Sequence, residues 1–258
     1  MKVAIIGLGF LGRSIVDGLN TSSSPDLRIE VSASKRNPGK GTDGLPPSLL
    51  RPASQNRRLA HDSHLVWVCV RNEDWVTVAE DLRGLGEQGE TVLISTAPGM
   101  KFDDVRKIWG SDNVIKSYPS IPVAVRAGFL PYLAGSRHAA KRFCEVSTLI
   151  GRALACRDEQ QLMAAGLFSS SGPALVLRFL TSLHRAFADS DLPAPVGELG
   201  RAVFAGTARW VIEKDINIEE GIDMIATPGG RTREGLRVLE EEDLDQIIAA
   251  AYRSMLPS

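Results

Sequence analysis

Short apolar runs alternate with segments of helical spacing along the first 117 residues. The runs are too short for helices and end at Gly, Ser or charged residues, which is typical of strands buried in a parallel sheet. On this pattern five strands are predicted: Val3–Ile6, Leu27–Ser32, Leu65–Val70, Val92–Ser95 and Val114–Ser117.

Apolar residues at helical spacing separate several of these runs. They predict helices at Gly12–Leu19, at Glu73–Leu82 and over residues 102–109. The segment 37–57 is rich in Pro and Gly and is predicted to be irregular or only briefly helical. Strands that alternate with helices predict an α/β fold, with a doubly wound, mainly parallel sheet and helices on both faces.

The pattern changes near residue 150, where strand-like runs give way to helical periodicity. Three wide apolar stripes follow, beginning at Leu175, Val196 and Leu244. A small helical domain cannot easily cover all of them, so we predict that they pack against a second subunit. The alternative is that they pack on each other and on the first domain. The chain therefore divides into an α/β domain, residues 1–153, and an all-α dimerisation domain, residues 154–258.

Composition narrows the class of protein. Of the 258 residues 43% are hydrophobic, the net charge is −1 and the pI is about 6.4, so no basic excess favours nucleic acid or an anionic membrane. No apolar run approaches the ~18 residues of a membrane span, and Met1 leads directly into a strand without a signal peptide. The sequence therefore predicts a protein without a nucleic-acid or membrane partner.

The cysteines and histidines add no site of their own. Three cysteines, Cys69, Cys144 and Cys156, lie far apart without a CxxC pair, which disfavours a disulfide framework or a zinc site. The four histidines show no metal-ligand spacing on any one helix, so no metal is predicted. Free thiols fit a reducing compartment, and we expect a cytoplasmic protein.

The stretch GLGFLG at residues 7–12 is a GxGxxG that follows a strand and opens a helix. Gly7 permits the tight turn, Gly9 lets the backbone approach a pyrophosphate, and Gly12 allows the helix to pack closely on the strand. The N–H groups of the helix start, at Phe10 and Leu11, would face the phosphates. The sequence therefore predicts a dinucleotide-binding Rossmann domain; the alternative is a merely tight turn.

The end of the second predicted strand bears on the choice of dinucleotide. An NAD site usually carries Asp or Glu there, bound to the ribose 2′-hydroxyl. Here the acid Glu30 lies within the strand, and Ser34, Lys35 and Arg36 follow. A hydroxyl and two cations suit a 2′-phosphate, so NADPH is predicted over NADH. The alternative is that Lys35 and Arg36 are solvated loop charges.

Two further segments end strands at the carboxyl edge of the sheet, where ligands bind in doubly wound folds. One is VRNED, residues 70–74, and the other is ISTAPGM, residues 94–100. We expect both to border the nicotinamide half of the cofactor, although ordinary loop chemistry is an alternative for any single residue. The residues concerned are Val70, Arg71, Asn72, Ala97 and Gly99.

Two segments of the helical half resemble each other in chemistry. SSSGPA at 169–174 and TPGGRTREGL at 227–236 each place hydroxyl groups and glycine just before a predicted helix. Free N–H groups at a helix N-terminus suit a carboxylate. The alternative is plain N-capping, with Ser171 or Thr232 as the cap.

The order of these motifs resembles that of the pyrroline-5-carboxylate reductase family, over almost the whole chain. The most specific part is TPGGRTREGLRVLEE at 227–241, which is similar to the family signature PGGxTxxGLxxLE. The resemblance implies reduction of the cyclic imino acid pyrroline-5-carboxylate to proline with NAD(P)H. It also implies a Rossmann domain followed by a helical domain that forms a homodimer or a larger homo-oligomer.

The resemblance further implies roles for single residues. Thr232 would hydrogen-bond the substrate nitrogen, and Ser171 would act beside it in catalysis. The backbone of Gly229, Gly230 and Arg231, with Thr227, would receive the substrate carboxylate. Ser171 and Gly172, from the same subunit or from its partner, would complete the pocket. A protonated imine is already a strong electrophile. The enzyme need only hold it beside the nicotinamide, so the reaction does not require a catalytic His or Lys.

Some positions depart from the family pattern. Arg71 and Asn72 stand where Lys-Pro is common, Ser120 where Asn is usual, and Leu175 where an aromatic residue is expected. They leave open a reductase of another cyclic imine, or a non-catalytic paralogue that binds NADPH. A hydroxyacid dehydrogenase is disfavoured, because residues 157–185 contain no lysine.

Overall fold

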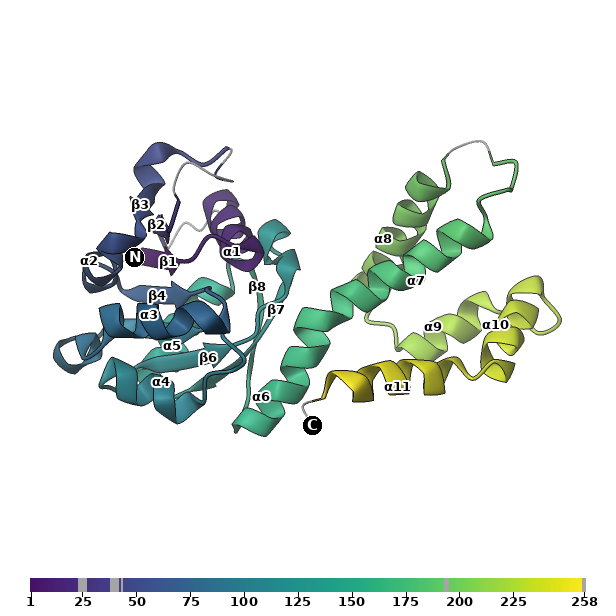
Figure 1. The fold of residues 1–258 in the computed structure, drawn as a ribbon. Coiled ribbons are helices and arrows are strands. Elements are labelled where there is room, and N and C mark those ends of the chain that lie inside the picture. Colours follow the sequence, from purple (N-terminus) through teal and green to yellow (C-terminus); the bar gives the residue numbers. More distant parts are fainter. Residues whose placement is uncertain (23–26, 38–41, 43, 193–194, 257–258) are drawn as a thin grey trace. The chain divides into compact units, whose positions relative to one another are not determined.

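The computed structural model describes residues 1–22, 27–37, 42, 44–192 and 195–256 (Figure 1). These form two compact units, Met1–Pro173 and Ala174–Ser258. The first is built on a sheet ordered β3-β2-β1-β4-β5-β6-β7-β8. Its strands are β1 (Lys2–Ile6), β2 (Glu30–Lys35), β3 (Leu50–Pro52), β4 (Leu65–Val68), β5 (Val92–Ser95), β6 (Val114–Ser117), β7 (Gly128–Ala134) and β8 (Gly151–Ala155). All pairs are parallel except β6 with β7, which confirms the predicted doubly wound sheet.

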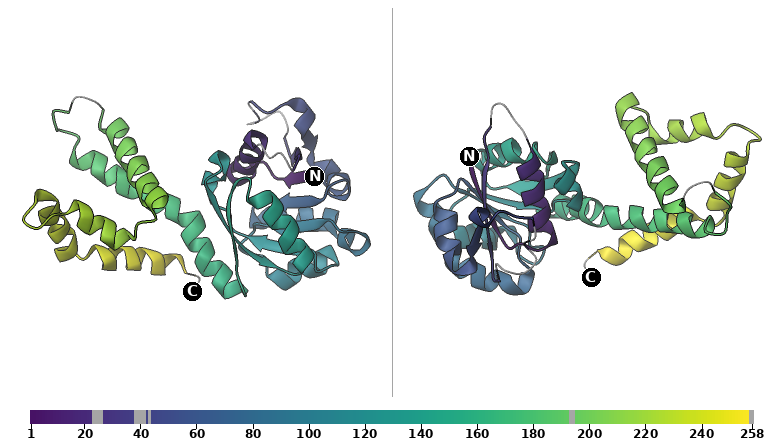
Figure 2. Two further views of the ribbon diagram at one scale, coloured as in Figure 1. Left: turned by 180° about the vertical axis from the view of Figure 1, so that it is seen from behind. Right: turned by 90° about the horizontal axis from the view of Figure 1, so that it is seen from above.

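Helices cover both faces of the sheet because side chains alternate along each buried strand. Val3 and Ile5 pack towards α1 (Phe10–Thr21) and α5 (Arg137–Ser147), whereas Ala4 and Ile6 pack towards the other face. Figures 1 and 2 show α3 (Asn72–Leu82) and α4 (Phe102–Trp109) on one face and α5 on the other. The interior of this unit is well filled, with Trp67, Trp75, Trp109 and Phe143 fully buried.

The apolar runs located most strands correctly. The predicted first, third, fourth and fifth strands match β1, β4, β5 and β6 within two residues, but the second is displaced: β2 covers Glu30–Lys35 instead of Leu27–Ser32. Pairing with β1 sets its register, from Lys2 opposite Glu30 to Ile6 opposite Ser34, so polar residues are drawn into the strand.

Two parts of the sheet went unpredicted. Within 37–57, residues 38–41 and 43 lie outside the described residues. The short 3₁₀ turns Pro47–Leu49 and Ala53–Gln55 agree with a briefly helical segment, whereas β3 and the start of α2 (Asn56–His61) were not predicted. β7, α5 and β8 were also missed. β8 is half exposed, so it has no apolar run, and it pairs through glycines: a Cβ on Gly151 would lie 2.1 Å from the Gly128 carbonyl oxygen.

The helix predicted to begin after SSSGP begins earlier. α6 (Glu159–Gly166), a π-helical turn (Leu167–Ser171) and α7 (Gly172–Ala186) are continuous, so Ser171 and Gly172 lie inside a helix. The expected free helix N-terminus at this segment is therefore wrong. Pro173 explains the irregular turn, because proline lacks an N–H and its ring clashes with the carbonyl one turn earlier in a regular α-helix.

Helix α6 and the π-helical turn are fixed to the end of β6. The Ser169 hydroxyl donates to the Tyr118 carbonyl at 2.7 Å, and the buried Lys116 Nζ lies 2.5 Å from the Glu159 carboxylate. Gly166 packs directly on the Tyr118 ring, since a Cβ there would lie 2.2 Å from Cδ2. These contacts make α6 part of the first unit.

The Gly166–Tyr118 contact predicts a specific coupling. Gly166→Ala should destabilise the protein by about 2 kcal/mol, because the ring has no room to move. Thermal unfolding should then occur about 4–8 °C lower. In a Tyr118→Ala background the same glycine substitution should have little effect, since the clashing ring atoms are gone. Equal losses in both backgrounds would contradict the packing described.

The second unit contains α8 (Val196–Lys214), α9 (Ile218–Ile225), α10 (Arg231–Glu241) and α11 (Leu244–Met255), after most of α7. The predicted stripes fall on α7, α8 and α11. Its described hydrophobic side chains are mostly exposed, and the buried ones are Leu180 and Ala226. An apolar groove of about 830 Å³ runs between α7 and α8, with Phe179, Phe187 and Phe204 among its lining residues. A unit with so little interior fits the predicted subunit interface; the division at residue 153 stays a prediction.

The continuous helix Glu159–Ala186 also corrects an expectation about membranes. The helix has 28 residues, and an 18-residue window within it has a mean hydropathy of 1.3. By length and composition alone, such a helix could cross a membrane. The expectation that no segment approaches such a length is therefore wrong for this helix.

Candidate functional site

A groove opens at the carboxyl ends of β1 and β4. From β1 the chain adds β2 and β3 on one side, and β4, β5 and β6 on the other, so the strand order reverses between β1 and β4. Such a switch point is where doubly wound sheets bind ligands. The groove has a volume of about 530 Å³. It brings together the following predicted cofactor residues: Gly7, Gly9, Ser34, Lys35, Arg36, Val70 and Arg71.

The glycines have the geometry that a pyrophosphate site requires. Gly7 has φ +96°, which side-chain-bearing residues rarely adopt. A Cβ on Gly12 would lie 2.0 Å from the Gly7 carbonyl oxygen, whereas a Cβ on Gly9 would meet nothing within 4 Å. Gly9 is also the N-cap of α1 and supplies no capping side chain, so the first N–H groups of the helix, at Phe10 and Leu11, are open to an anion. These residues fit a dinucleotide.

The end of β2 is held by a buried polar chain. The Ser34 hydroxyl donates to Asn56 Oδ1 at 2.6 Å, and Asn56 Nδ2 donates to Asp81 Oδ2 at 3.1 Å. Ser34 therefore faces the groove with its proton already committed. Arg36 extends from the end of β2 and forms an ion pair with Asp74 of α3. Sequence reasoning missed Asn56 because it lies in the segment predicted to be irregular.

The loops after β4 and β5 close on each other. Asn72 Oδ1 accepts a hydrogen bond from the Gly99 backbone N–H at 3.2 Å, and a Cβ on Gly99 would lie 2.8 Å from Asn72 Nδ2. Two residues predicted from separate strand ends thus meet at the same edge. Ala97 is 1% exposed and packs in the core, so it can serve this edge only through its backbone.

Cys69 lies in the groove lining, and burial raises the pKa of its thiol to about 12, from an ordinary value of 9.0. Since the thiolate is the reactive form, iodoacetamide at about pH 8 should leave Cys69 almost unmodified in the folded protein, with a thiolate fraction about 1000-fold lower than in the unfolded chain. Peptide mass mapping before and after denaturation measures this. Rapid labelling of Cys69 in the folded protein would contradict the assignment.

In the second unit, Thr227–Gly230 form a tight turn that opens α10. The Gly230 N–H donates to the Thr227 carbonyl at 3.0 Å, and Gly229 has φ +75°, as a type II turn with Pro at its second position favours. Gly230 is the N-cap and offers no side chain, and Thr232 is the second residue of the helix. Thr232 is therefore not the cap, and the helix start that begins at Arg231 is open to an anion.

Arg233 was not predicted to matter, yet it fixes this turn. Its guanidinium donates to the Asp223 carboxylate and to the Ala226 carbonyl, both at 2.8 Å, and so ties α10 to the end of α9. The sequence alone gives no reason to distinguish Arg233 from the other solvated charges of this segment. Its partners are separated from it by seven and ten residues, beyond the reach of helical spacing rules.

The remaining site residues are placed as follows. Ser171 and Gly172 belong to the first unit, at the junction of the π-helical turn with α7. Ser120 is buried, and its hydroxyl accepts a hydrogen bond from the Phe129 N–H at 2.8 Å. The departure at Ser120 therefore ties the chain to β7, which is a structural role.

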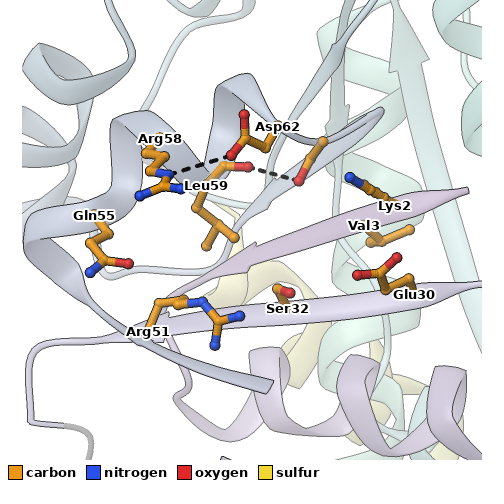
Figure 3. A pocket seen from close by; sticks show the side chains of 10 residues that line it. Lys2, Val3, Glu30, Ser32, Arg51, Gln55, Arg58, Leu59 and Asp62 are labelled. Atoms are coloured by element: carbon orange, nitrogen blue, oxygen red, sulfur yellow. Dashed lines mark hydrogen bonds and ion pairs between the residues drawn. The ribbon is translucent and has the colours of Figure 1, made fainter. Parts of the chain in front are cut away.

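A second cavity, of about 270 Å³, lies where β1 and β2 begin (Figure 3). Glu30 lines it together with Lys2, so this acid lies at the amino end of β2 rather than at the cofactor end. Figure 3 shows the Arg58–Asp62 ion pair beside it, at 3.6 Å. Because its charges are mixed and largely exposed, we assign this cavity no part in the site.

Comparison with known proteins agrees with this geometry. Residues 159–256 match the family described as pyrroline-5-carboxylate reductase dimerisation, and residues 2–99 match the NADP oxidoreductase, coenzyme F420-dependent family. A pyrroline-5-carboxylate reductase of Aquifex aeolicus is 24% identical over 94% of this chain and 90% of its own length. One from Escherichia coli is 23% identical over 93% and 90%. Residues 159–256 thus match the dimerisation domain of pyrroline-5-carboxylate reductases, and over nearly its whole length the chain is similar to such enzymes.

Solved structures of pyrroline-5-carboxylate reductases share the fold. One from Coxiella burnetii has a TM-score of 0.84 and 23% identity, covering 98% of this chain and 94% of its own. One from Plasmodium falciparum, with NADP bound, has a TM-score of 0.81 and 20% identity, covering 98% and 95%. The NADP oxidoreductase match and the curated relatives identify an oxidoreductase with a nicotinamide cofactor, and the dimerisation match identifies a homo-oligomer.

Proposed function

We propose that this protein reduces 1-pyrroline-5-carboxylate to L-proline with NADPH. The observation that carries the proposal is the open, uncapped helix start at Thr227–Thr232, in a chain whose other unit carries an open dinucleotide groove. The helix start suits a carboxylate-bearing substrate, and the groove suits a pyrophosphate-bearing cofactor. These are the two ligands of such a reaction.

The residues of the turn act by binding and orientation. The backbone N–H groups at Arg231 and Thr232 hold the substrate carboxylate, next to Gly229, where a Cβ would meet nothing within 4 Å. Gly230 packs closely on Thr227, since a Cβ there would lie 2.9 Å from the Thr227 hydroxyl oxygen. The Thr232 hydroxyl hydrogen-bonds the ring nitrogen. Arg233 keeps the turn in place through α9. The bound nicotinamide supplies the hydride, so the protein needs no nucleophile or metal.

Thr227 contributes to the proposed substrate pocket, and Ser171 and Gly172, of the same subunit or of its partner, complete it. The π-helical turn supports a role for Ser171 and Gly172, because such turns inside α-helices are frequent at functional sites. Here the turn is held by Ser169, whose hydroxyl bonds the Tyr118 carbonyl. That bond fixes the rotation of the helix and hence the side on which Ser171 lies.

NADPH is the proposed cofactor rather than NADH. Lys35, the last residue of β2, and Arg36 after it line the groove, and β2 carries no acid at that end. The two cations suit the ribose 2′-phosphate, which NADH lacks. Ala97, Asn72 and Gly99 would border the nicotinamide half, at the ends of β4 and β5.

The assay that tests the proposal follows loss of NADPH absorbance with pyrroline-5-carboxylate, beside its six-membered homologue piperideine carboxylate. Fast turnover of the five-membered ring alone supports proline formation. Preference for the larger ring would establish the alternative of a different cyclic imine. Tight NADPH binding without turnover of either would establish a non-catalytic paralogue or a more specialised substrate.

We also propose a cytoplasmic homodimer or larger homo-oligomer with no membrane or nucleic-acid partner. The dimerisation family covers 159–256, which includes the apolar helix of membrane-span length, so a second copy of the chain accounts for its exposed face. Light scattering of the purified protein without detergent tests this, and a monomer or a detergent-dependent aggregate would oppose it.

A further inference from the structure

One wall of the cofactor groove carries two carboxylates, although the groove is expected to hold phosphates. Asp74, Thr77, Val78 and Asp81 of α3 all line it. Residues spaced by three, four and seven share one face of a helix. Helix α3 therefore presents two carboxylates, Asp74 and Asp81, to the groove.

The two acids have different partners. Asp81 ends the buried chain that runs through Asn56 to Ser34, so it belongs to the structure that holds β2. Asp74 instead pairs with Arg36, whose side chain is 76% exposed. The partner of Asp74 is therefore an exposed cation. Asp74 and Arg36 both line the groove.

The pair changes what Arg36 can offer a ligand. A guanidinium has five N–H donors, so a second anion can share it. The Asp74 carboxylate nevertheless neutralises Arg36 and repels a phosphate dianion placed beside it. An exposed ion pair is weak and can be displaced, but displacement and repulsion both oppose a 2′-phosphate. Neither effect acts on a cofactor with a free 2′-hydroxyl.

We propose that Asp74 is a specificity-determining residue that limits the preference for NADPH over NADH by holding Arg36. The proposal rests on the cofactor site of the proposed function and adds an acidic counterweight to its cations. Removing the Asp74 charge should raise the affinity for the 2′-phosphorylated cofactor and leave that for the other cofactor nearly unchanged.

The test uses 2′,5′-ADP and 5′-AMP, the adenosine halves of the two cofactors, titrated calorimetrically into the full-length protein. Asp74→Asn should bind 2′,5′-ADP about three- to tenfold more tightly, and 5′-AMP with less than about a twofold change. Arg36→Ala should weaken 2′,5′-ADP selectively. In the Arg36→Ala background the Asp74→Asn gain should be smaller, because only the direct repulsion between Asp74 and the phosphate remains. In the wild-type background the gain should shrink as salt is added.

The matched control is Glu80→Gln, which removes one exposed charge from the same helix away from the groove. It should change neither affinity. Unchanged or weaker 2′,5′-ADP binding in Asp74→Asn would overturn the proposal, as would an equal gain without Arg36. If neither nucleotide bound the wild-type protein, the cofactor site of the proposed function would fail as well, whereas binding that ignores Asp74 removes only this inference.

Discussion

Replacing Thr232 by Val is expected to lower kcat/KM for the cyclic imine by about 100-fold. The substitution keeps the shape of the side chain and removes the hydroxyl that we assign to the ring nitrogen. A single lost donor that acts on the reacting atoms typically costs a factor of about 10²–10³. Because that bond strengthens as the nitrogen gains electron density, kcat should fall at least as much as KM rises.

The control for this result is Thr232→Ser, which keeps the hydroxyl and should retain activity within about fivefold. Thr232 is exposed at the second position of α10 and does not cap the helix, so neither change should disturb folding. Steady-state kinetics with NADPH, together with cofactor titration, measures both effects. A Val variant with activity similar to wild type would remove Thr232 from the mechanism.

Parallel strands were predictable because burial on both faces makes them continuous apolar runs. β4, β5 and β6 are buried throughout; the bounds of β5 and β6 followed from the sequence, and those of β4 to within two residues. β8 has a mixed pattern and is defined by its partner β7, so its identity depends on a distant pairing. β2 was displaced for the same reason, since β1 decides which residues it contains.

The candidate site divides in the same way. Local backbone chemistry predicted the Gly7 turn and the helix start after Gly230, because each depends on residues adjacent in sequence. The same reasoning failed at SSSGP, where Pro173 suggested a helix start but a π-helical turn accommodates it. A local rule could not anticipate that the Tyr118 carbonyl would hold Ser169 from 51 residues away.

The residues that sequence reasoning missed share one feature. Asn56, Asp74 and Arg233 each act through a partner on another element. Asn56 lies outside every motif, and Asp74 and Arg233 lie inside singled-out segments at positions to which no role was assigned. They hold or modulate groups that the motifs did identify. Motif residues therefore indicate which ligands the protein binds, whereas their unpredicted neighbours decide how firmly the site is held and how it discriminates.

The same contrast separates two glycines of one motif. Gly12→Ala is expected to destabilise the protein by about 3 kcal/mol, because its Cβ would lie 2.0 Å from the Gly7 carbonyl oxygen, a backbone atom that cannot rotate away. For a chain of this size, thermal unfolding should fall by about 6–12 °C. Displacing α1 from β1 should also abolish measurable cofactor binding.

Gly9→Ala is expected to weaken cofactor binding without destabilising the fold. A Cβ on Gly9 meets no protein atom within 4 Å, so the variant should unfold within about 2 °C of wild type. That Cβ points into space that the pyrophosphate needs, and NADPH affinity should fall by about tenfold or more. Calorimetric titration and thermal unfolding of both variants give the comparison. If Gly9→Ala bound NADPH normally, the groove would not hold the pyrophosphate at α1, and if Gly12→Ala were as stable as wild type, the close packing of α1 on β1 would be wrong.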